Sequence, residues 1–203
     1  ANSRKGDGTL LVNTPVSEEP RDVFVYDPEV PVMAPGGPQA LSGPFDQSAL
    51  EMGNNLLVYT SSPVVHEIEV FGRPHVRLYA TTSAKHADFT AKVVRVTLNG
   101  RVEFLSIGIA RSAHLFGDAG CAADEVKAWE FTLEPVAFVL AQGERLRLEI
   151  ASSAFPLYDR NPSTDVEPQL ADHWNWKRST QQVLHSAEHS SVLYLPVAGD
   201  PGW

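Results

Sequence analysis

The clearest pattern along the chain is an alternation of apolar and charged residues that begins near residue 145. Leu146, Leu148 and Ile150 alternate with arginine and glutamate side chains. A period of two places one face of a β-strand on a core and the other face in water. We therefore expect a strand over residues 145–151, with Arg147 and Glu149 on its solvent face.

Similar patterns elsewhere predict an all-β chain with almost no helix. Strands are expected at 56–60, 64–71, 75–81, 89–98, 102–110, 126–134 and 145–151, with 192–197 closing the chain. Many short strands at spacings of roughly 8–12 residues favour a β-sandwich of antiparallel sheets over a parallel α/β sheet. The Asn99-Gly100 pair predicts a type I′ hairpin turn, since both central positions tolerate a positive φ.

Two of the predicted strands change their alternation partway along. The apolar parity switches after Val93 in one strand and after Phe104 in the next. Either β-bulges lie at these points, or both faces of the strands are covered. We favour bulges.

Residues 28–47 differ from the rest of the chain in composition. They hold five prolines and three glycines. Proline lacks the amide donor that a strand ladder requires, and it breaks helices. The segment is therefore predicted to be a long ordered arm or loop.

Length and charge limit what the chain can do. Its 203 residues, 43% hydrophobic and 20% charged, are typical of one globular domain over residues 1–203. The formal charge of −9 repels phosphate backbones and anionic lipid, and no apolar run approaches the ~20 residues of a membrane span. We expect neither nucleic acid nor membrane as a partner. The single cysteine, Cys121, allows no intrachain disulfide or cysteine-based zinc site and is compatible with a cytoplasmic location.

Three groups of residues could carry chemistry. His185 and His189 have the i, i+4 spacing of helical metal ligands, but no third ligand is evident, so no metal is expected. A structural use is favoured for them and for Asp159, Arg160 and Asn161, which could satisfy a tight turn through an ion pair and backbone hydrogen bonds. Trp174 and Trp176 would share a face if the chain is extended there. They could cap the sandwich, contact another domain or bind a ligand.

A series of short motifs along residues 10–197 resembles the C-terminal domain of X-Pro dipeptidyl-peptidases and cocaine-esterase-like (CocE/NonD) serine hydrolases. The motifs, in chain order, are YDP at 26–28, VPV at 30–32, GG at 36–37, GP at 43–44, DQ at 46–47, VYTS at 58–61, DFTAK at 88–92, NGR at 99–101, FPLYDRNPST at 155–164, EHSS at 188–191 and LPV at 195–197. The resemblance implies a jelly-roll β-sandwich, galactose-binding-like, with two antiparallel sheets.

The resemblance also implies a function. In this family the domain follows a catalytic α/β-hydrolase domain and lacks the nucleophile. No Gly-x-Ser-x-Gly motif occurs in this chain. We therefore expect a non-catalytic domain, inactive alone and without a cofactor. The catalytic domain of the same polypeptide would precede residue 1, and a homo-oligomer is left open.

The expected role is to pack on the catalytic domain and help to shape its substrate pocket. The family approaches that domain with the segment that here reads Pro38, Gln39, Ala40 and Leu41. Trp174 and Trp176 are further candidates for the pocket or the domain interface. The alternative function is a carbohydrate- or ligand-binding β-sandwich module.

Overall fold

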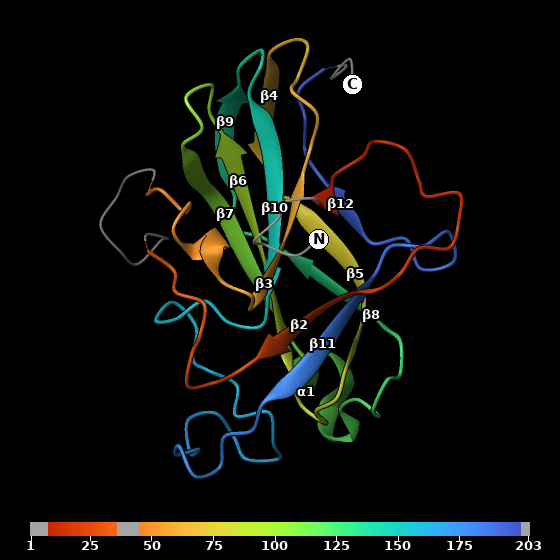
Figure 1. Cartoon of the computed structure of the whole chain (residues 1–203), viewed down its shortest axis with the longest axis vertical. Helices are drawn as coiled ribbons and strands as arrows, with labels where there is room; N and C mark the ends of the chain where they lie inside the picture. The colour runs from red at the N-terminus through yellow and green to blue at the C-terminus, as the bar shows by residue number, and fades with distance from the viewer. Residues whose placement is uncertain (1–7, 36–44, 200–203) are drawn as a thin grey trace.

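The computed structural model describes residues 8–35 and 45–199, and these form two β-sheets packed face to face (Figure 1). One sheet has the order β1-β3-β10-β6-β7, made of Gly8–Thr9, Leu56–Thr60, Arg145–Ala151, Asp88–Val96 and Val102–Arg111. In the second sheet β5, His75–Thr82, pairs on one side with β8, Lys127–Thr132, and on the other with β11, Ser179–Leu184, and β12, Val192–Tyr194. The strand β2, Asp22–Tyr26, pairs with β11 at the edge.

The strand order is that of a jelly roll. The orders β2-β11-β5-β8 and β3-β10-β6-β7 interleave strands from both halves of the chain in each sheet. The predicted all-β sandwich is therefore confirmed, with two additions. The strands β4, Ile68–Gly72, and β9, Val136–Leu140, form a separate ribbon, and β1 pairs with β3 in parallel.

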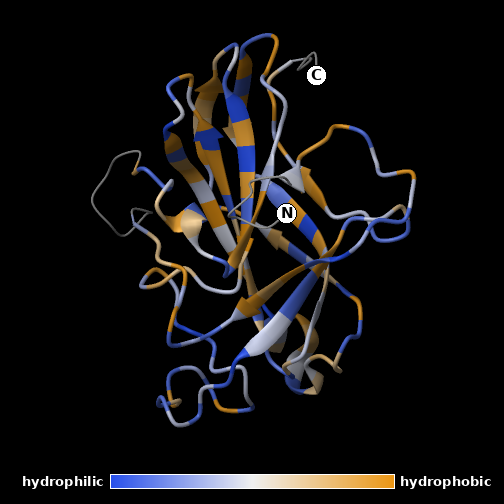
Figure 2. Ribbon diagram, in the orientation of Figure 1, coloured by the Kyte–Doolittle hydropathy of each residue, from blue (hydrophilic) through white to orange (hydrophobic). Residues whose placement is uncertain are grey.

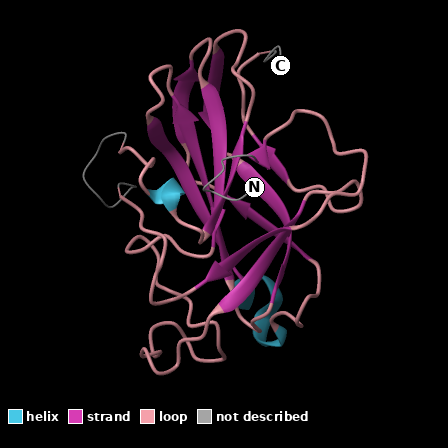
Figure 3. Cartoon of the chain, viewed as in Figure 1, coloured by secondary structure: helices cyan, strands magenta, loops and turns pink. Residues whose placement is uncertain are grey.

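In the part of the chain that the structure describes, helical structure is limited to short connections, as Figure 3 shows. These are the 3-10 turns η1, Leu50–Met52, and η2, Gly117–Ala119, and the short helix α1, Ser112–Phe116. None of the helices in the described ranges has the length and apolar character needed to span a membrane.

The core lies between the sheets, and polar and apolar stretches alternate along the strands that enclose it (Figure 2). Trp129 of β8 is fully buried, and its ring meets Phe89 of β6 edge-on with centroids 4.8 Å apart. Phe116 of α1 contacts the same tryptophan at 5.0 Å, and Phe24 of β2 contacts Phe89 at 6.4 Å. Edge-to-face aromatic packing therefore joins strands of both sheets.

Several strand boundaries differ from the prediction. The expected strand at 64–71 begins only at Ile68, and the one expected at 126–134 covers Lys127–Thr132. The strands β9 and β11 were not predicted. In β11 the inward positions include the polar residues Ser179 and Gln181, whose buried side chains bond to each other at 3.0 Å. The sequence of this inner strand therefore lacks an apolar alternation.

The parity changes in β6 and β7 have different causes. Val93 pairs with Ser106 and Val94 pairs with Phe104, which leaves Leu105 as the additional residue. The bulge predicted near Phe104 is therefore confirmed. In β6, which has no additional residue, every side chain from Asp88 to Val94 is buried, so its parity change reflects the coverage of both faces.

The hairpin between these strands is not of type I′. Gly100 has a φ of 81°, whereas Asn99 is not among the described residues with a positive φ. The amide of Gly100 donates to the Thr97 carbonyl, and the amide of Thr97 donates to the Arg101 carbonyl. These bonds close a three-residue loop with glycine at its last position, another common hairpin connection.

The outer face of the β3-β10-β6-β7 sheet is covered by the chain's own connection from β2 to β3. Val32 packs against β3 and β10, and Ala34 packs against Ile107 of β7. As a result, Glu149 is only 2% exposed, and Arg147 is largely buried. The expectation that the charged side of β10 faces water is therefore wrong, because this connection covers it.

Candidate functional site: a polar cluster at the base of residues 36–44

The chain on both sides of residues 36–44 is tied to the outer face of this sheet. Before the segment, the amide of Ala34 donates to the carbonyl of Phe155 at 2.8 Å. After it, the amide of Gln47 donates to the carbonyl of Val102 at 2.8 Å, at the edge of β7. Main-chain hydrogen bonds thus hold the chain on both sides of residues 36–44.

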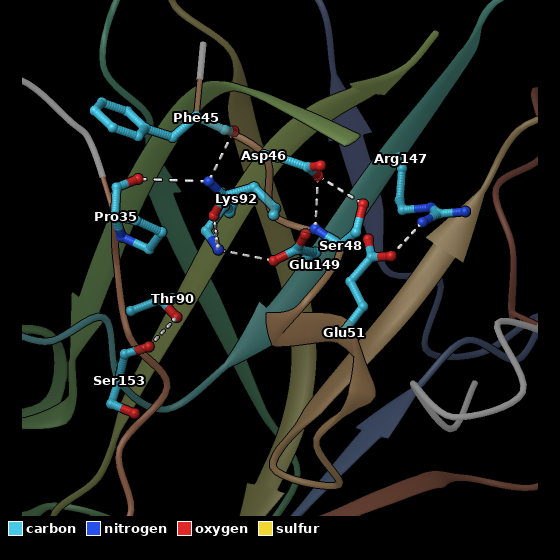
Figure 4. A network of polar contacts seen from close by, with 11 residues as sticks. Pro35, Phe45, Asp46, Ser48, Glu51, Thr90, Lys92, Arg147, Glu149 and Ser153 are labelled. Carbon is cyan, nitrogen blue, oxygen red and sulfur yellow. Dashed lines mark hydrogen bonds and ion pairs between the residues drawn. The ribbon is translucent and has the colours of Figure 1, made fainter. Parts of the chain in front are cut away.

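The side chain of Gln47 joins the two flanking stretches by binding Pro35 and Phe45, which Figure 4 labels. Its Nε2 lies 3.4 Å from the carbonyl oxygen of Pro35 and 3.0 Å from that of Phe45. Its Oε1 accepts a hydrogen bond from Lys92 Nζ at 3.0 Å. We call the Gln47 amide with the carbonyls of Pro35 and Phe45 the Gln47 clamp.

Lys92 connects this clamp to the middle of the sheet. Lys92 of β6 and Glu149 of β10 are cross-strand neighbours, and Lys92 Nζ lies 2.8 Å from Glu149 Oε2. Both side chains are almost completely buried. A buried ion pair tolerates the loss of one partner poorly, because the remaining charge is then left without solvation.

A second carboxyl group completes the cluster. Glu51 of η1 pairs with Arg147 of β10 through its Oε2. Burial raises the pKa of Glu51 to about 7, the hydrogen bond from Arg147 opposes this, and the charge of Glu149 adds to it. Among the described residues, Glu51 Oε1 and Glu149 Oε1 are buried and have no hydrogen-bond partner. A proton on Glu51 would remove one of the two negative charges from this buried cluster.

This cluster holds the main chain at Pro35 and Phe45 in place. Its amide, ammonium, guanidinium and carboxyl groups bind one another and the main chain. Sequence reasoning did not single out its members as site residues. The signal that could have found two of them is their place in the motifs DQ at 46–47 and DFTAK at 88–92.

The four residues predicted to approach a catalytic domain, Pro38, Gln39, Ala40 and Leu41, lie outside the described residues. The structure places the chain on either side of them. Their role stays a prediction.

Trp174 and Trp176 lie at a turn, so the condition of an extended chain, under which they would share a face, is not met. The amide of Asn175 donates to the carbonyl of Asp172, which reverses the chain. Trp174 is 82% exposed and stacks on His173 at 4.3 Å. Trp176 instead packs on the guanidinium of Arg160 at 4.2 Å.

Asp159, Arg160 and Asn161 have separate contacts. Arg160 lies between the rings of Trp176 and Phe155, and its Nη1 donates to the Pro28 carbonyl at 3.3 Å. The Asp159 side chain is exposed, and its carbonyl accepts from Arg111.

Asn161 is buried at the foot of the same loop. Its Nδ2 donates to Asp88 Oδ1 at 2.8 Å, and its Oδ1 accepts from the amide of Ser163 at 2.8 Å. Burial raises the pKa of Asp88 to about 6, although Arg111 and Asn161 both lower it. Asn161 thus links the loop to the start of β6.

The two histidines contact different partners. His185 Nε2 lies 3.0 Å from Asp22 Oδ2, and its Nδ1 lies 3.1 Å from Glu19 Oε2. The hydrogen bond to Asp22 raises the pKa of His185, and burial opposes it. His189 packs edge-on against Tyr79 at 5.3 Å. Within residues 8–35 and 45–199, no group of three or more His, Cys, Asp or Glu side chains could hold a metal ion.

Cys121 is buried, and burial raises the pKa of its thiol to about 11. Its amide donates to the carbonyl of Lys85 at 2.8 Å. The thiol is therefore protonated at neutral pH and packs as a small apolar group.

Comparisons with known proteins agree with the fold. The chain is 31% identical over 207 residues to cocaine esterase from Rhodococcus sp. (strain MB1 Bresler), which covers 97% of this chain and 35% of the esterase. It is 28% identical over 162 residues to a putative serine esterase from Mycobacterium bovis, which covers 70% of this chain and 24% of that protein.

Two solved structures superimpose on it with a TM-score of 0.84. An aminopeptidase from a marine sediment Thaumarchaeota archaeon is 27% identical, and an alpha-amino acid ester hydrolase is 26% identical. Each match covers 95% of this chain and 35% of the other. The chain thus spans about a third of the length of these two structures and of the cocaine esterase.

A family model described as the X-Pro dipeptidyl-peptidase C-terminal non-catalytic domain matches residues 1–194. The match covers nearly the whole chain and includes both sheets and the polar cluster. This chain belongs to the family of X-Pro dipeptidyl-peptidase C-terminal non-catalytic domains.

Proposed function

We propose that this domain packs against the catalytic α/β-hydrolase domain of the same polypeptide and forms one wall of its substrate pocket. The parent protein would be a serine hydrolase of the acyl esterase or X-Pro dipeptidyl-peptidase type. The relatives named cocaine esterase, alpha-amino acid ester hydrolase and aminopeptidase support an ester or amide bond as the bond that is cleaved.

The observation that carries this proposal is the construction of the polar cluster. A buried ion pair and a buried glutamine are costly to place inside a protein unless every group is paired. Here they bind Pro35 and Phe45, the residues on either side of residues 36–44, at the outer face of the sheet. This supports the idea that the position of that segment matters to the parent enzyme.

Leu41 is the residue of this segment proposed to contact substrate or the catalytic domain. In the full-length hydrolase, Leu41→Asp is expected to lower kcat/KM about tenfold, which corresponds to about 1.4 kcal/mol. The melting temperature of the 203-residue chain should stay nearly unchanged. Unaltered kinetics would remove the segment from the active site, whereas a collapsed chain would place Leu41 in the core.

A second candidate function, carbohydrate binding, is favoured only by the exposure of Trp174. An exposed indole next to His173 offers a flat face on which a sugar ring could stack. A glycan array probed with the chain tests this candidate. A signal that disappears in Trp174→Ala would support it, and an array without signal would leave Trp174 as a packing or interface residue.

A further inference from the structure

Gln47 is a buried polar side chain whose three hydrogen bonds converge from different parts of the chain. It has no measurable exposure. Its amide nitrogen donates to Pro35 and Phe45, and its carbonyl oxygen accepts from Lys92. The surroundings of this buried amide favour glutamine at position 47, because each hydrogen bond left unmade would lower the stability of the fold by about 1–3 kcal/mol.

The chemistry of its neighbours fixes the orientation of this amide. The ammonium of Lys92 can only donate, so it must face the oxygen of Gln47. The carbonyls of Pro35 and Phe45 can only accept, so they must face the nitrogen. Lys92 is itself held by Glu149 at 2.8 Å, so the orientation follows from the sheet.

We propose that Gln47, oriented by Lys92, is a positioning residue that sets the separation of the two chain ends flanking residues 36–44, and so sets how that segment meets the substrate pocket. This inference rests on the proposed function. Gln47 does not touch substrate. It acts through the carbonyls of Pro35 and Phe45, which are both within 3.4 Å of one nitrogen atom.

The variant Gln47→Glu tests the Gln47 clamp separately from the contact between Gln47 and Lys92. Glutamate has nearly the same shape and still offers an oxygen to Lys92. As a carboxylate it has no proton to donate, and one of its oxygens would face the two carbonyl oxygens. The contact with Lys92 is therefore kept, while the attraction between the two chain ends is replaced by repulsion.

Gln181→Glu is the matched control. Gln181 is also fully buried, but it lies in the opposite sheet from Lys92 and bonds to Ser179 of its own strand, β11. Both variants place a carboxyl group in the interior, so a general loss of stability should affect both. Only Gln47→Glu should affect the ends of residues 36–44.

The first measurement is hydrogen exchange of the 203-residue chain. We expect the amides of Ala34 and Gln47, which bond to Phe155 and Val102, to exchange at least tenfold faster in Gln47→Glu than in Gln181→Glu. The second measurement is kinetics of the full-length hydrolase well below its melting temperature. We expect Gln47→Glu to lower kcat/KM about tenfold and Gln181→Glu to leave it within about twofold.

The outcomes separate this inference from the proposed function. If Leu41→Asp lowers kcat/KM and Gln47→Glu does not, the positioning role of Gln47 is overturned and the proposed function stands. If Leu41→Asp has no effect, the proposed function is overturned, and exchange still reports whether Gln47 holds the two ends. Equal exchange in both variants would overturn the clamp itself. Should Gln47→Glu fail to fold, Gln47→Asn keeps the amide, withdraws it by one methylene and is expected to give the same two effects.

Discussion

Replacing Lys92 by methionine should destabilise the 203-residue chain strongly. Methionine fills similar space, so little cavity is created, and the main loss is electrostatic. Glu149, only 2% exposed, would lose its partner at 2.8 Å, and Gln47 Oε1 would lose its donor. Breaking one side of a buried ion pair typically costs about 3–5 kcal/mol. At about 2–4 °C per kcal/mol for a domain of this size, the melting temperature should fall by about 6–20 °C.

Lys85→Met is the control with the same chemical change. Lys85 pairs with Asp165 at 3.0 Å, but both side chains are about half exposed or more. Exposed pairs contribute about 0–1 kcal/mol, so this variant should melt within a few degrees of the parent. Urea unfolding at pH 7 with unchanged m-values gives the comparison. Equal and small losses in both variants would refute the burial of the Lys92–Glu149 pair, and with it the account of the cluster.

Two further predictions concern the neighbours of this pair. Leu148→Ala should lower the free energy of unfolding by about 2–5 kcal/mol, because Leu148 packs in the inter-sheet core. Arg147→Ala should lower it by about 1–3 kcal/mol, because the contacts with Glu51 and Thr60 are lost. Urea unfolding in which Arg147→Ala loses no stability would contradict the burial of Arg147. The pKa of Glu51 is raised from 4.5 to about 7, so between these pH values the folded state binds a proton that the unfolded state has lost. Stability from this group should be fully present below pH 4.5, decline by up to about 3 kcal/mol as the pH rises to about 7, and then level off. Glu51→Gln should lack this decline, and pH-dependent curves that fall equally in both proteins would contradict the assignment.

The sequence predicted the two-sheet fold because the fold depends on repeated local patterns. Leu146, Leu148 and Ile150 face the core as their alternation indicates. The same alternation gave the wrong environment for Glu149. Whether the second face of a strand meets water depends on what the rest of the chain lays over it, and a period of two carries no information about that.

One of the missed strands, β11, and the missed site have related causes. In β11, Ser179 and Gln181 are buried and bond to each other, so polar residues stand at inward positions of this strand. In the polar cluster, Gln47, Lys92 and Glu149 come from three distant parts of the chain and meet only after the sheet forms. Buried polar groups are recognised by their partners, and sequence spacing does not reveal partners that are 45 or 57 residues apart.

The central proposal is that this domain acts on the substrate pocket of a catalytic domain through residues 36–44. The most direct test compares kcat/KM of the full-length hydrolase carrying Leu41→Asp with that carrying Leu98→Asp, which alters a leucine that is 75% exposed in the β6–β7 hairpin. We predict about a tenfold loss for Leu41→Asp and a change within about twofold for Leu98→Asp, with both melting temperatures nearly unchanged. Equal kcat/KM values for the two variants would contradict the proposal.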